Sequence, residues 1–441
     1  MKKIFTSAIV LLLLASVLIV GCTADPETIV ETIVVTEEVV VEKEVVVEVP
    51  AEEEDVTITY FTFSAAPDHL EDLDEMISIF EAENPKIHIE VQTASYDDYF
   101  TKLQTRIAGG DAPDVFELNY ESFVSYAAKG VLLNLEPLAQ ADPDYDASIY
   151  YQRALDAFNY KGMQLGLPET FSTVMLYYNQ DLFDSAGVAY PAADWTWDDV
   201  IVAGKSIMEG NDDAWGIHSS IHFWEFYKKA AQNNCQFFNE DQTEVLLTSP
   251  ECVVALETMI SLLDEGVMPT NAEMGGVSDG DLFISGDLGM LVSGIWMFSA
   301  FEENPFNWDI QVEPGMATQA THFFANAVNV FAGTKNAEAA YEWVKFFTSD
   351  PAMAEIRIDS AWELPALNNP DYVAGYLLQS PPENRQAVFD SLEYAIVPPV
   401  IERQNEMTDV IGAALDQAVL GAITPLEALE QAKAGIEALL P

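Results

Sequence analysis

Two groups of side chains in this sequence have types and spacings that could bind a metal ion. His218 and His222 are four residues apart with Glu225 close by, so on a helix the two imidazoles would share one face. The residues between them are Ser-Ser-Ile, however, and lack the glutamate of the H-E-x-x-H pattern. Tyr177 and Tyr178 could clamp a ferric ion, but the apolar segment around them favours packing in a core. We therefore predict no metal site and no cofactor.

Enzymatic chemistry finds little support in the sequence. The chain has no phosphate-binding P-loop and no G-x-G-x-x-G dinucleotide fingerprint. A glycosidase needs two carboxyl groups at a defined separation, and 73 Asp and Glu residues offer too many candidates for a pair to be chosen. We predict a protein that is not an enzyme.

Charge and cysteine content exclude several other classes. The formal net charge is −55, so nucleic acid and anionic lipid surfaces would be repelled. Three cysteines are too few for a disulfide-dense scaffold or a four-thiolate metal site. With 441 residues, of which 49% are hydrophobic, the chain is long enough for two domains with their own cores.

The N-terminus is typical of a secreted protein. Two lysines precede Ile4–Val20, seventeen apolar or small residues, which is short for a membrane-spanning helix. The end of this run, Ile19-Val20-Gly21-Cys22, resembles the lipobox of bacterial lipoprotein precursors. That resemblance implies a signal peptide at 1–21 and lipidation of Cys22, which would hold the protein at the outer face of the cytoplasmic membrane. An uncleaved anchor followed by an unrelated cysteine is the alternative.

Residues 22–55 are expected to be a tether rather than part of a core. ETIV occurs twice in succession from Glu27, EVVV occurs twice from Glu38, and residues 23–55 carry 12 acids against one Lys. The valine clusters could also form a short β-ribbon or a helical association segment, and the periodicity does not decide between these. We favour a charged, low-complexity spacer.

Two further cysteines, Cys235 and Cys252, remain after Cys22 is lipidated. Outside the cytoplasm they could form a disulfide across the turn before the helix start at Ser249-Pro250. Two buried free thiols are the alternative.

From Val56 onwards, strands and helices alternate. The predicted strands are 56–63, 86–91 and 114–118, and the predicted helices are 68–83, 96–108 and 120–129. This order and spacing predict a parallel α/β sheet, whose ligands lie in loops at the carboxyl ends of the strands. The loops after the first and third strands, 64–67 and 119–122, are therefore candidate binding segments.

Five blocks in the same chain order resemble bacterial extracellular solute-binding proteins of ABC sugar importers, of which maltose-binding protein is a distant member. The blocks are APDVFELNYESFVSYAAKGVLLNLEPL (112–138), GLPETFSTVMLYYNQDLFDSAGV followed by WTWDD (166–199), FISG through GM and SGIW (283–296), ANAV through AAYEWVKFFTS (325–349), and LPA after Trp362 (362–366). The family implies an α/β fold of two lobes, each a mixed, mainly parallel sheet flanked by helices, joined by hinges around a ligand cleft. It implies lobe 1 at 56–168 and 317–361, and lobe 2 at 169–316 and 362–441. The crossovers are placed near 168–170, 312–316 and 362–365.

Sugars present apolar C–H faces and rings of hydroxyl groups, so aromatic platforms with carboxylates and amides suit them. By position in the family, Glu121 matches an acidic residue that accepts sugar hydroxyls, and Trp296 matches a stacking Trp; a solvated helix-terminal Glu and a core Trp are the respective alternatives. The full set that the resemblance implies for ligand binding is Ser64, Asn119, Glu121, Phe171, Ser172, Trp296, Asn326 and Trp362. Trp224 could also line the cleft, but core packing is favoured for it.

The resemblance predicts an extracytoplasmic, lipid-anchored, monomeric receptor that captures a mono- or oligosaccharide between closing lobes and delivers it to ABC permease subunits. A receptor for polyamines or other cations is the first alternative, because the acidic chain would attract them. A secreted, lipid-anchored carbohydrate-active enzyme is the alternative from another class. The signal and tether account for little of the charge, since −46 remains on residues 56–441.

Overall fold

The computed structural model describes residues 28–31, 43–46, 55–63, 67–360 and 363–440. Residues up to Glu54 form one unit and those from Asp55 form another. In the first unit β1 (Thr28–Glu31) pairs antiparallel with β2 (Lys43–Val46), so the β-ribbon that was one alternative for this segment is present. Cys22 and the signal peptide lie outside the described residues.

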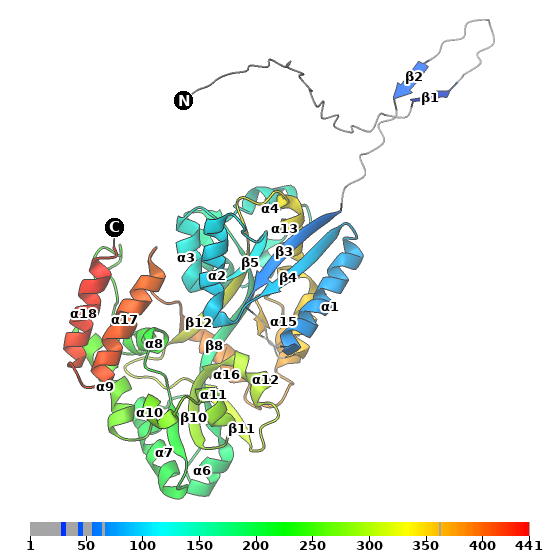
Figure 1. The fold of residues 1–441 in the computed structure, drawn as a ribbon. Helices are drawn as coiled ribbons and strands as arrows, with labels where there is room; N and C mark the ends of the chain where they lie inside the picture. Colours follow the sequence, from blue (N-terminus) through cyan, green and yellow to red (C-terminus); the bar gives the residue numbers. More distant parts are fainter. Residues whose placement is uncertain (1–27, 32–42, 47–54, 64–66, 361–362, 441) are drawn as a thin grey trace, which may run out of the picture. The chain divides into compact units, whose positions relative to one another are not determined.

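The second unit is built on one mixed β-sheet, whose main path runs in the order β4-β3-β5-β12-β8-β10-β9 (Figure 1). β11 and β13 pair with β8, β14 pairs with β12, and β6 and β7 form a separate hairpin. The strands are β3 (Val56–Thr62), β4 (Ile87–Thr93), β5 (Val115–Asn119), β6 (Asn159–Tyr160), β7 (Met163–Gln164), β8 (Leu167–Asn179), β9 (Trp215–His218), β10 (Leu288–Gly294), β11 (Trp308–Val312), β12 (Thr321–Val330), β13 (Leu364–Pro365) and β14 (Ala395–Ile396).

The helices follow the strands closely in sequence. They are α1 (Pro67–Glu83), α2 (Tyr96–Gly109), α3 (Tyr120–Ala128), α4 (Glu136–Ala141), α5 (Gln152–Ala157), α6 (Gln180–Ala186), α7 (Trp197–Gly210), α8 (Phe223–Gln232), α9 (Pro250–Asp264), α10 (Asn271–Met274), α11 (Asp279–Ile284), α12 (Phe298–Phe301), α13 (Ala337–Ser349), α14 (Pro351–Asp359), α15 (Pro370–Tyr376), α16 (Gln386–Asp390), α17 (Gln404–Val419) and α18 (Pro425–Glu437), with short 3-10 turns η1 (Ala147–Ile149), η2 (Ile295–Met297) and η3 (Ser391–Glu393). None of the described helices has both the length and the apolar character that crossing a bilayer requires.

The first half of the sheet has the predicted α/β pattern. β3 pairs in parallel with β4 and with β5, and each predicted strand and helix of this region starts and ends within two residues of its observed bounds. Asn119 ends β5 and caps α3, because its side chain accepts a hydrogen bond from the Ser122 N–H, an unpaired donor in the first turn. The strand thus passes directly into the helix that carries Glu121.

The sheet contains more antiparallel pairing than the expected mainly parallel arrangement. β12 pairs antiparallel with β5 and β8, and β10 and β11 pair antiparallel with β8. The long, fully buried strand β8 exchanges β12 for β10 between Thr173 and Val174, so one strand serves both halves of the sheet. A chain that passes repeatedly between two halves must re-enter a sheet in the opposite direction, and this explains the mixed pairing.

Helices cover both halves of the sheet. In Figure 1, α1, α2, α3 and α13 surround β3, β4 and β5, whereas α6, α7 and α11 lie with β10 and β11. Trp343 of α13 is completely buried and contacts Tyr60 of β3 and Phe80 of α1 edge-on. These aromatic contacts fix α1 and α13 against the sheet, because each large ring removes a wide apolar area from water.

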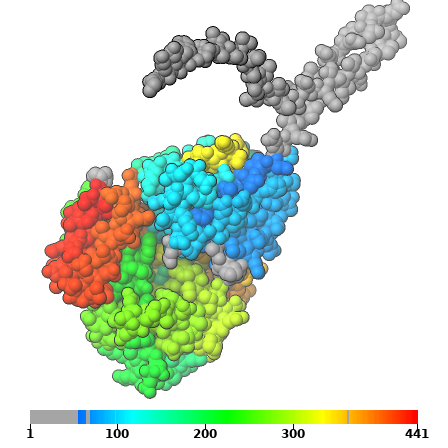
Figure 2. All heavy atoms as spheres, viewed as in Figure 1, coloured from blue at the N-terminus to red at the C-terminus, as the bar shows by residue number. Residues whose placement is uncertain are grey.

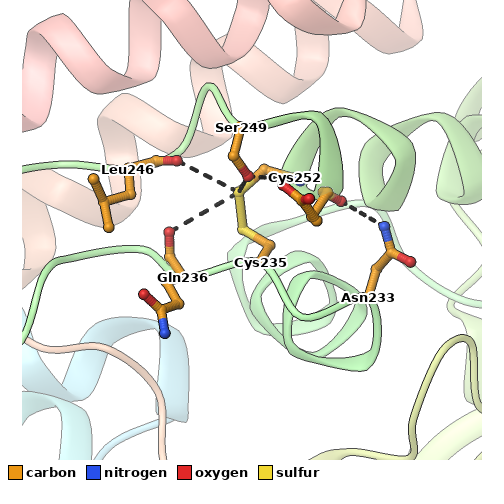
Figure 3. Close-up of a disulfide and its surroundings, with 7 residues drawn as sticks. Asn233, Cys235, Gln236, Leu246, Ser249 and Cys252 are labelled. Carbon is orange, nitrogen blue, oxygen red and sulfur yellow. Dashed lines mark hydrogen bonds between the residues drawn. A yellow bond between two sulfur atoms is a disulfide. The ribbon is translucent and has the colours of Figure 1, made fainter.

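A disulfide links Cys235, just after α8, to Cys252 in the first turn of α9 (Figure 3). The expected bridge is therefore present. Asn233 supports the same turn, since its Nδ2 donates to the Glu251 carbonyl at 2.8 Å. The helices α8, α9, α17 and α18 share one apolar core, and the outer side of the C-terminal segment, orange to red in Figure 2, forms part of the surface.

Candidate functional site

One face of β12 gathers most of the residues considered for ligand binding. Because side chains alternate along a strand, His322, Phe324 and Asn326 point to the same side, which we call the β12 face. Phe324 and Asn326 are partly exposed, whereas His322 is fully buried. The β12 face therefore presents an aromatic ring and an amide to solvent, backed by a buried imidazole.

Trp296 stands against this face. Its ring lies edge-on to Phe324 with 5.1 Å between centroids, and 38% of the residue is exposed. Gly294 makes this position possible, because a Cβ there would lie 2.0 Å from the Trp296 ring. The SGIW segment thus needs its glycine so that the indole can lie against the backbone at the end of β10, where part of Trp296 stays accessible. Trp296 is not the core residue that was its alternative.

Trp224 and Tyr227 of α8 pack on the other side of His322. The ring centroids of Trp224 and His322 are 5.9 Å apart, and Trp224 also contacts Phe324. Trp224 is partly exposed, so core packing describes it incompletely. The result is a row of aromatic rings that runs from α8 across β12 to Trp296.

Glu121 lies at the buried end of the β12 face. Its Oε1 is 3.0 Å from Nε2 of His322, and the two residues are 2% and 0% exposed. Burial raises the pKa of Glu121 to about 8. Burial also lowers the pKa of His322 well below its usual range, and the charges of Lys228 and His222 lower it further. Near neutral pH the contact is therefore a hydrogen bond between two neutral groups, and Glu121 is not the solvated helix-terminal carboxylate that was its alternative.

At the other end of the face, polar side chains form a row across three strands. In the strand register Asn326 lies opposite Asn119 on one side and Thr170 on the other. Asn119 donates to the hydroxyl of Tyr96, which is 49% exposed, at 3.0 Å. Asn326 Nδ2 donates to Thr170 Oγ1 and to Oε2 of Glu363, at 3.4 and 3.3 Å. The predicted residues Asn119 and Asn326 thus form one row with Thr170 and with the carboxyl group of Glu363, which was not among the predicted site residues.

The structure places the remaining predicted residues differently. Phe171 is 2% exposed and stacks on Phe323 in the core, on the opposite side of the sheet from Asn326, so it is not brought to the β12 face. Ser172 shares the side of Phe324 but is fully buried. Ser64 and Trp362 lie outside the described residues.

The histidine and tyrosine pairs are not metal sites of the kind that their spacing could suggest. His218 ends β9 and His222 caps α8, so the two do not share a helix face. Tyr177 and Tyr178 are buried, and the Tyr177 hydroxyl donates to the Gly294 carbonyl. In the described part of the chain no group of three or more His, Cys, Asp or Glu residues is arranged to hold a metal ion.

A G-x-S-x-G pattern at 276–280 does not form the strained strand-to-helix turn of a nucleophile elbow. Ser278 instead caps α11, accepting from the Asp281 N–H at 3.0 Å and donating to the Asp281 carboxylate at 2.8 Å. Its hydroxyl is committed to helix capping.

Comparison with known families decides the identity of the chain. Residues 65–354 match the sequence profile of the family described as bacterial extracellular solute-binding protein. The chain belongs to this family. A relative at the sequence level is the multiple sugar-binding protein of Streptococcus mutans, which is 24% identical over 330 residues, covering 69% of this chain and 73% of the relative.

Solved structures agree with this family. An ABC substrate-binding protein from Listeria monocytogenes, solved in complex with cycloalternan, is 45% identical to this solute-binding protein with a TM-score of 0.85, covering 88% of this chain and 99% of the other. The GacH receptor of Streptomyces glaucescens, solved with acarbose, shares the fold at 22% identity and a TM-score of 0.78, covering 88% and 99% of the two chains. The two-lobed α/β fold that the resemblance implied is confirmed.

The residues of the β12 face that sequence reasoning missed are His322, Phe324 and Glu363. Counting back from Asn326 in steps of two along THFFANAV would have found Phe324 and His322, because the strand alternates. No sequence signal marks Glu363 beyond its place beside Trp362, because its partners Thr170 and Asn326 are far away in the sequence.

Proposed function

We propose that this solute-binding protein is the extracytoplasmic receptor of an ABC importer and that it captures an oligosaccharide on the β12 face. The ligand is clamped between two lobes, and the liganded form is delivered to the permease. The chain makes and breaks no bond of the ligand.

The observation that carries the proposal is the combination of a partly exposed indole with polar side chains on neighbouring strands. Trp296 offers a flat apolar surface for the C–H face of a pyranose, and Asn326 and the exposed hydroxyl of Tyr96, which Asn119 holds, offer polar groups to sugar hydroxyls. An aromatic platform next to planar polar groups is the combination that a neutral, hydroxyl-rich ligand needs.

Cycloalternan is the first ligand to test, because it is bound to the 45% identical Listeria monocytogenes protein. We expect isothermal titration of the purified protein to show saturable binding of cycloalternan or maltotriose, and no binding of spermidine. Ligand binding also raises apparent stability by mass action, by about 2.7 kcal/mol at a hundredfold excess over Kd. Stabilisation by spermidine with none by any saccharide would reject the proposal.

Trp296→Ala tests the location of the site. Removing a stacking ring that the ligand covers should weaken saccharide binding by roughly tenfold or more. Tyr190→Ala is a matched control, because Tyr190 is a similarly exposed ring, at 40%, but packs on Tyr178 and Phe183 away from the β12 face. Equal effects of the two substitutions would place the ligand elsewhere.

A cation receptor fits the site less well. An amine is held by carboxylates that remain ionised, whereas burial raises the pKa of Glu121 to about 8. Near neutral pH the Glu121 carboxyl group is therefore mainly protonated, and it favours hydroxyl groups over ammonium groups as partners.

The lipid anchor and the lobe boundaries belong to the same proposal. We propose cleavage before Cys22 and lipidation of its thiol, which Cys22→Ser should abolish, as seen by the mass of the mature N-terminus and by release from membranes. We also propose lobe 1 at 56–168 and 317–361 and lobe 2 at 169–316 and 362–441. The partner exchange along β8 supports a boundary in that strand.

A further inference from the structure

Glu363 has its carboxyl group held in a fixed orientation by two strands. Its Oε2 accepts a hydrogen bond from Thr170 Oγ1 of β8 at 2.6 Å and another from Asn326 Nδ2 of β12 at 3.3 Å. Both donors act on the same oxygen, and the residue is partly exposed. One oxygen is therefore committed to the protein, and Oε1 receives no hydrogen bond among those found in the described residues.

Glu363 also completes the polar row of the β12 face. Asn119, Asn326 and Thr170 are neighbours in the strand register, and Glu363 follows as the partner of the last two. Asn326 shares its face with Phe324, on which Trp296 packs. The carboxyl group thus lies in line with the amides, beside the aromatic platform where we place the ligand.

The charged groups near Glu363 interact with other partners and do not neutralise its carboxylate directly. Arg357 of α14 pairs with Glu169 of β8 at 2.6 Å, and Glu117 of β5 accepts from Thr62 at 2.6 Å. Glu169 Oε2 is buried with no hydrogen-bond partner in the described region. Glu169 therefore adds negative potential at Glu363 that the single guanidinium offsets only in part.

This environment sets the pKa of the Glu363 carboxyl group. Burial, and after it the charge of Glu169, raise the pKa of Glu363, whereas the hydrogen bonds from Thr170 and Asn326 and the charge of Arg357 lower it, and together these effects bring the pKa to about 7. Near neutral pH a modest change in its surroundings is enough to move the proton on or off.

We propose that Glu363 is a ligand-binding and specificity-determining residue whose Oε1 accepts hydroxyl hydrogens of the saccharide. The inference rests on the proposed function and adds a residue and a proton linkage to it. Hydroxyl donors stabilise the ionised carboxylate, so the ligand lowers the pKa of Glu363. By linkage, affinity must rise as the pH rises through about 7 and level off above it.

The experiment is calorimetric titration of the full mature protein with cycloalternan and maltotriose at pH 5.5, 7 and 8.5. In buffers of different ionisation enthalpy, the wild type should release up to one proton per ligand near pH 6. Glu363→Gln should bind about ten- to a hundredfold more weakly at pH 8.5, the effect of one hydrogen bond to a charged group. Its affinity should also be independent of pH.

Two further variants keep the test decisive. Asp309→Asn is the matched control, because burial also raises the pKa of Asp309 but its carboxyl accepts from the Asn384 and Ile310 N–H groups, away from the β12 face. It should retain the wild-type pH profile. Thr170→Val removes the hydroxyl that lowers the pKa of Glu363, so the midpoint of the affinity profile should move to higher pH.

The possible results distinguish failure of the role of Glu363 from failure of the proposed function. Saccharide binding that is independent of pH in the wild type, or unaffected in Glu363→Gln, overturns the role of Glu363 and leaves the receptor function standing. A midpoint that Thr170→Val does not move also overturns it. Absence of saccharide binding in every variant at every pH removes the proposed function, and this inference with it.

Discussion

Two charge clusters, both largely buried, lie at segments predicted to connect the lobes, and they differ in their ratio of cations to carboxyl groups. The lysine cluster contains Lys228, Lys229, Glu225 and Glu313. Both Lys Nζ atoms lie 2.8 Å from Glu313, in the expected second crossover, and Lys229 also lies 3.6 Å from the centre of the Trp197 ring. Two cations thus face two carboxylates.

The carboxyl cluster contains Glu117, Glu169, Glu363 and Arg357. Three carboxyl groups share one guanidinium, and Glu169 and Glu363 lie in the expected first and third crossovers. Burial raises the pKa of Glu117 well above its usual range, and the charge of Glu169 raises it further. The environment of the cluster therefore favours the protonated form of its carboxyl groups.

The ratio of cations to carboxyl groups determines what each cluster can do. In the lysine cluster burial would raise the pKa of Glu225, but Lys228 and Lys229 outweigh burial and lower it to about 2. Glu225 therefore stays ionised over the physiological range, which suits a structural role. The carboxyl cluster changes protonation near neutrality, which suits a role coupled to ligand.

The largest expected effect comes from unbalancing the lysine cluster. Glu313→Gln leaves two buried ammonium groups against one carboxylate, so we expect a loss of about 3–5 kcal/mol in the free energy of unfolding. Urea denaturation at pH 7 measures it. A loss below about 1 kcal/mol would mean that the cluster is hydrated and that the contrast between the two clusters is false.

The disulfide next to α8 should have the second-largest effect. Replacing Cys235 and Cys252 together by Ser frees a loop with a sequence separation of 17, for which the stability loss should be about 3 kcal/mol. Hydrogen exchange should show faster opening of α8 and α9 and unchanged protection of β3 and β5. Equal loosening of both regions would contradict this separation.

The two clusters should respond to pH in opposite windows. The lowered pKa of Glu225 stabilises the fold above the unfolded value of about 4.3, and that stability is lost as the pH falls towards 2. The raised pKa of Glu363 favours the protonated fold, so its contribution is lost as the pH rises from the unfolded value of about 4.3 through 7. Glu225→Gln should flatten the acid limb of the stability curve, and Glu363→Gln should flatten the neutral limb. Flattening of the same limb by both would refute the assignment.

The smallest effect is expected at the surface. Lys205 and Glu265 form an ion pair with both side chains about half exposed, so Glu265→Gln should cost less than about 1 kcal/mol. This variant also serves as the exposed control for Glu313→Gln in the same denaturation series. A comparable loss in the two variants would show that burial does not set the energy of these pairs.

Much of the fold was predictable because local patterns specify it. Hydrophobic periodicity gave the first strands and helices nearly to their observed ends. The antiparallel share of the sheet was not predicted. It depends on how β8 and β12 pair across long sequence separations, which local hydrophobicity does not encode.

The candidate site was predictable in part for a similar reason. Trp296 and Asn326 were identified from a resemblance, and the structure places both at the β12 face. The prediction for Phe171 was wrong because side chains alternate along β8. Thr170 lies on the same side of the sheet as Asn326, and Phe171, the next residue, therefore points to the opposite side. The state of Glu121 could not be foreseen, because its partner His322 lies 201 residues away.

The sequence by itself determined the α/β class, the family and the residues that can cap, bridge or stack, because these depend on composition and short-range pattern. Only the tertiary structure decided which acids keep their protons. That depends on burial and on the number of cations within reach, as Glu225 beside two lysines and Glu363 near one shared arginine show. Identical side chains thus acquire different charges, because desolvation and Coulomb interactions are set by distances in space.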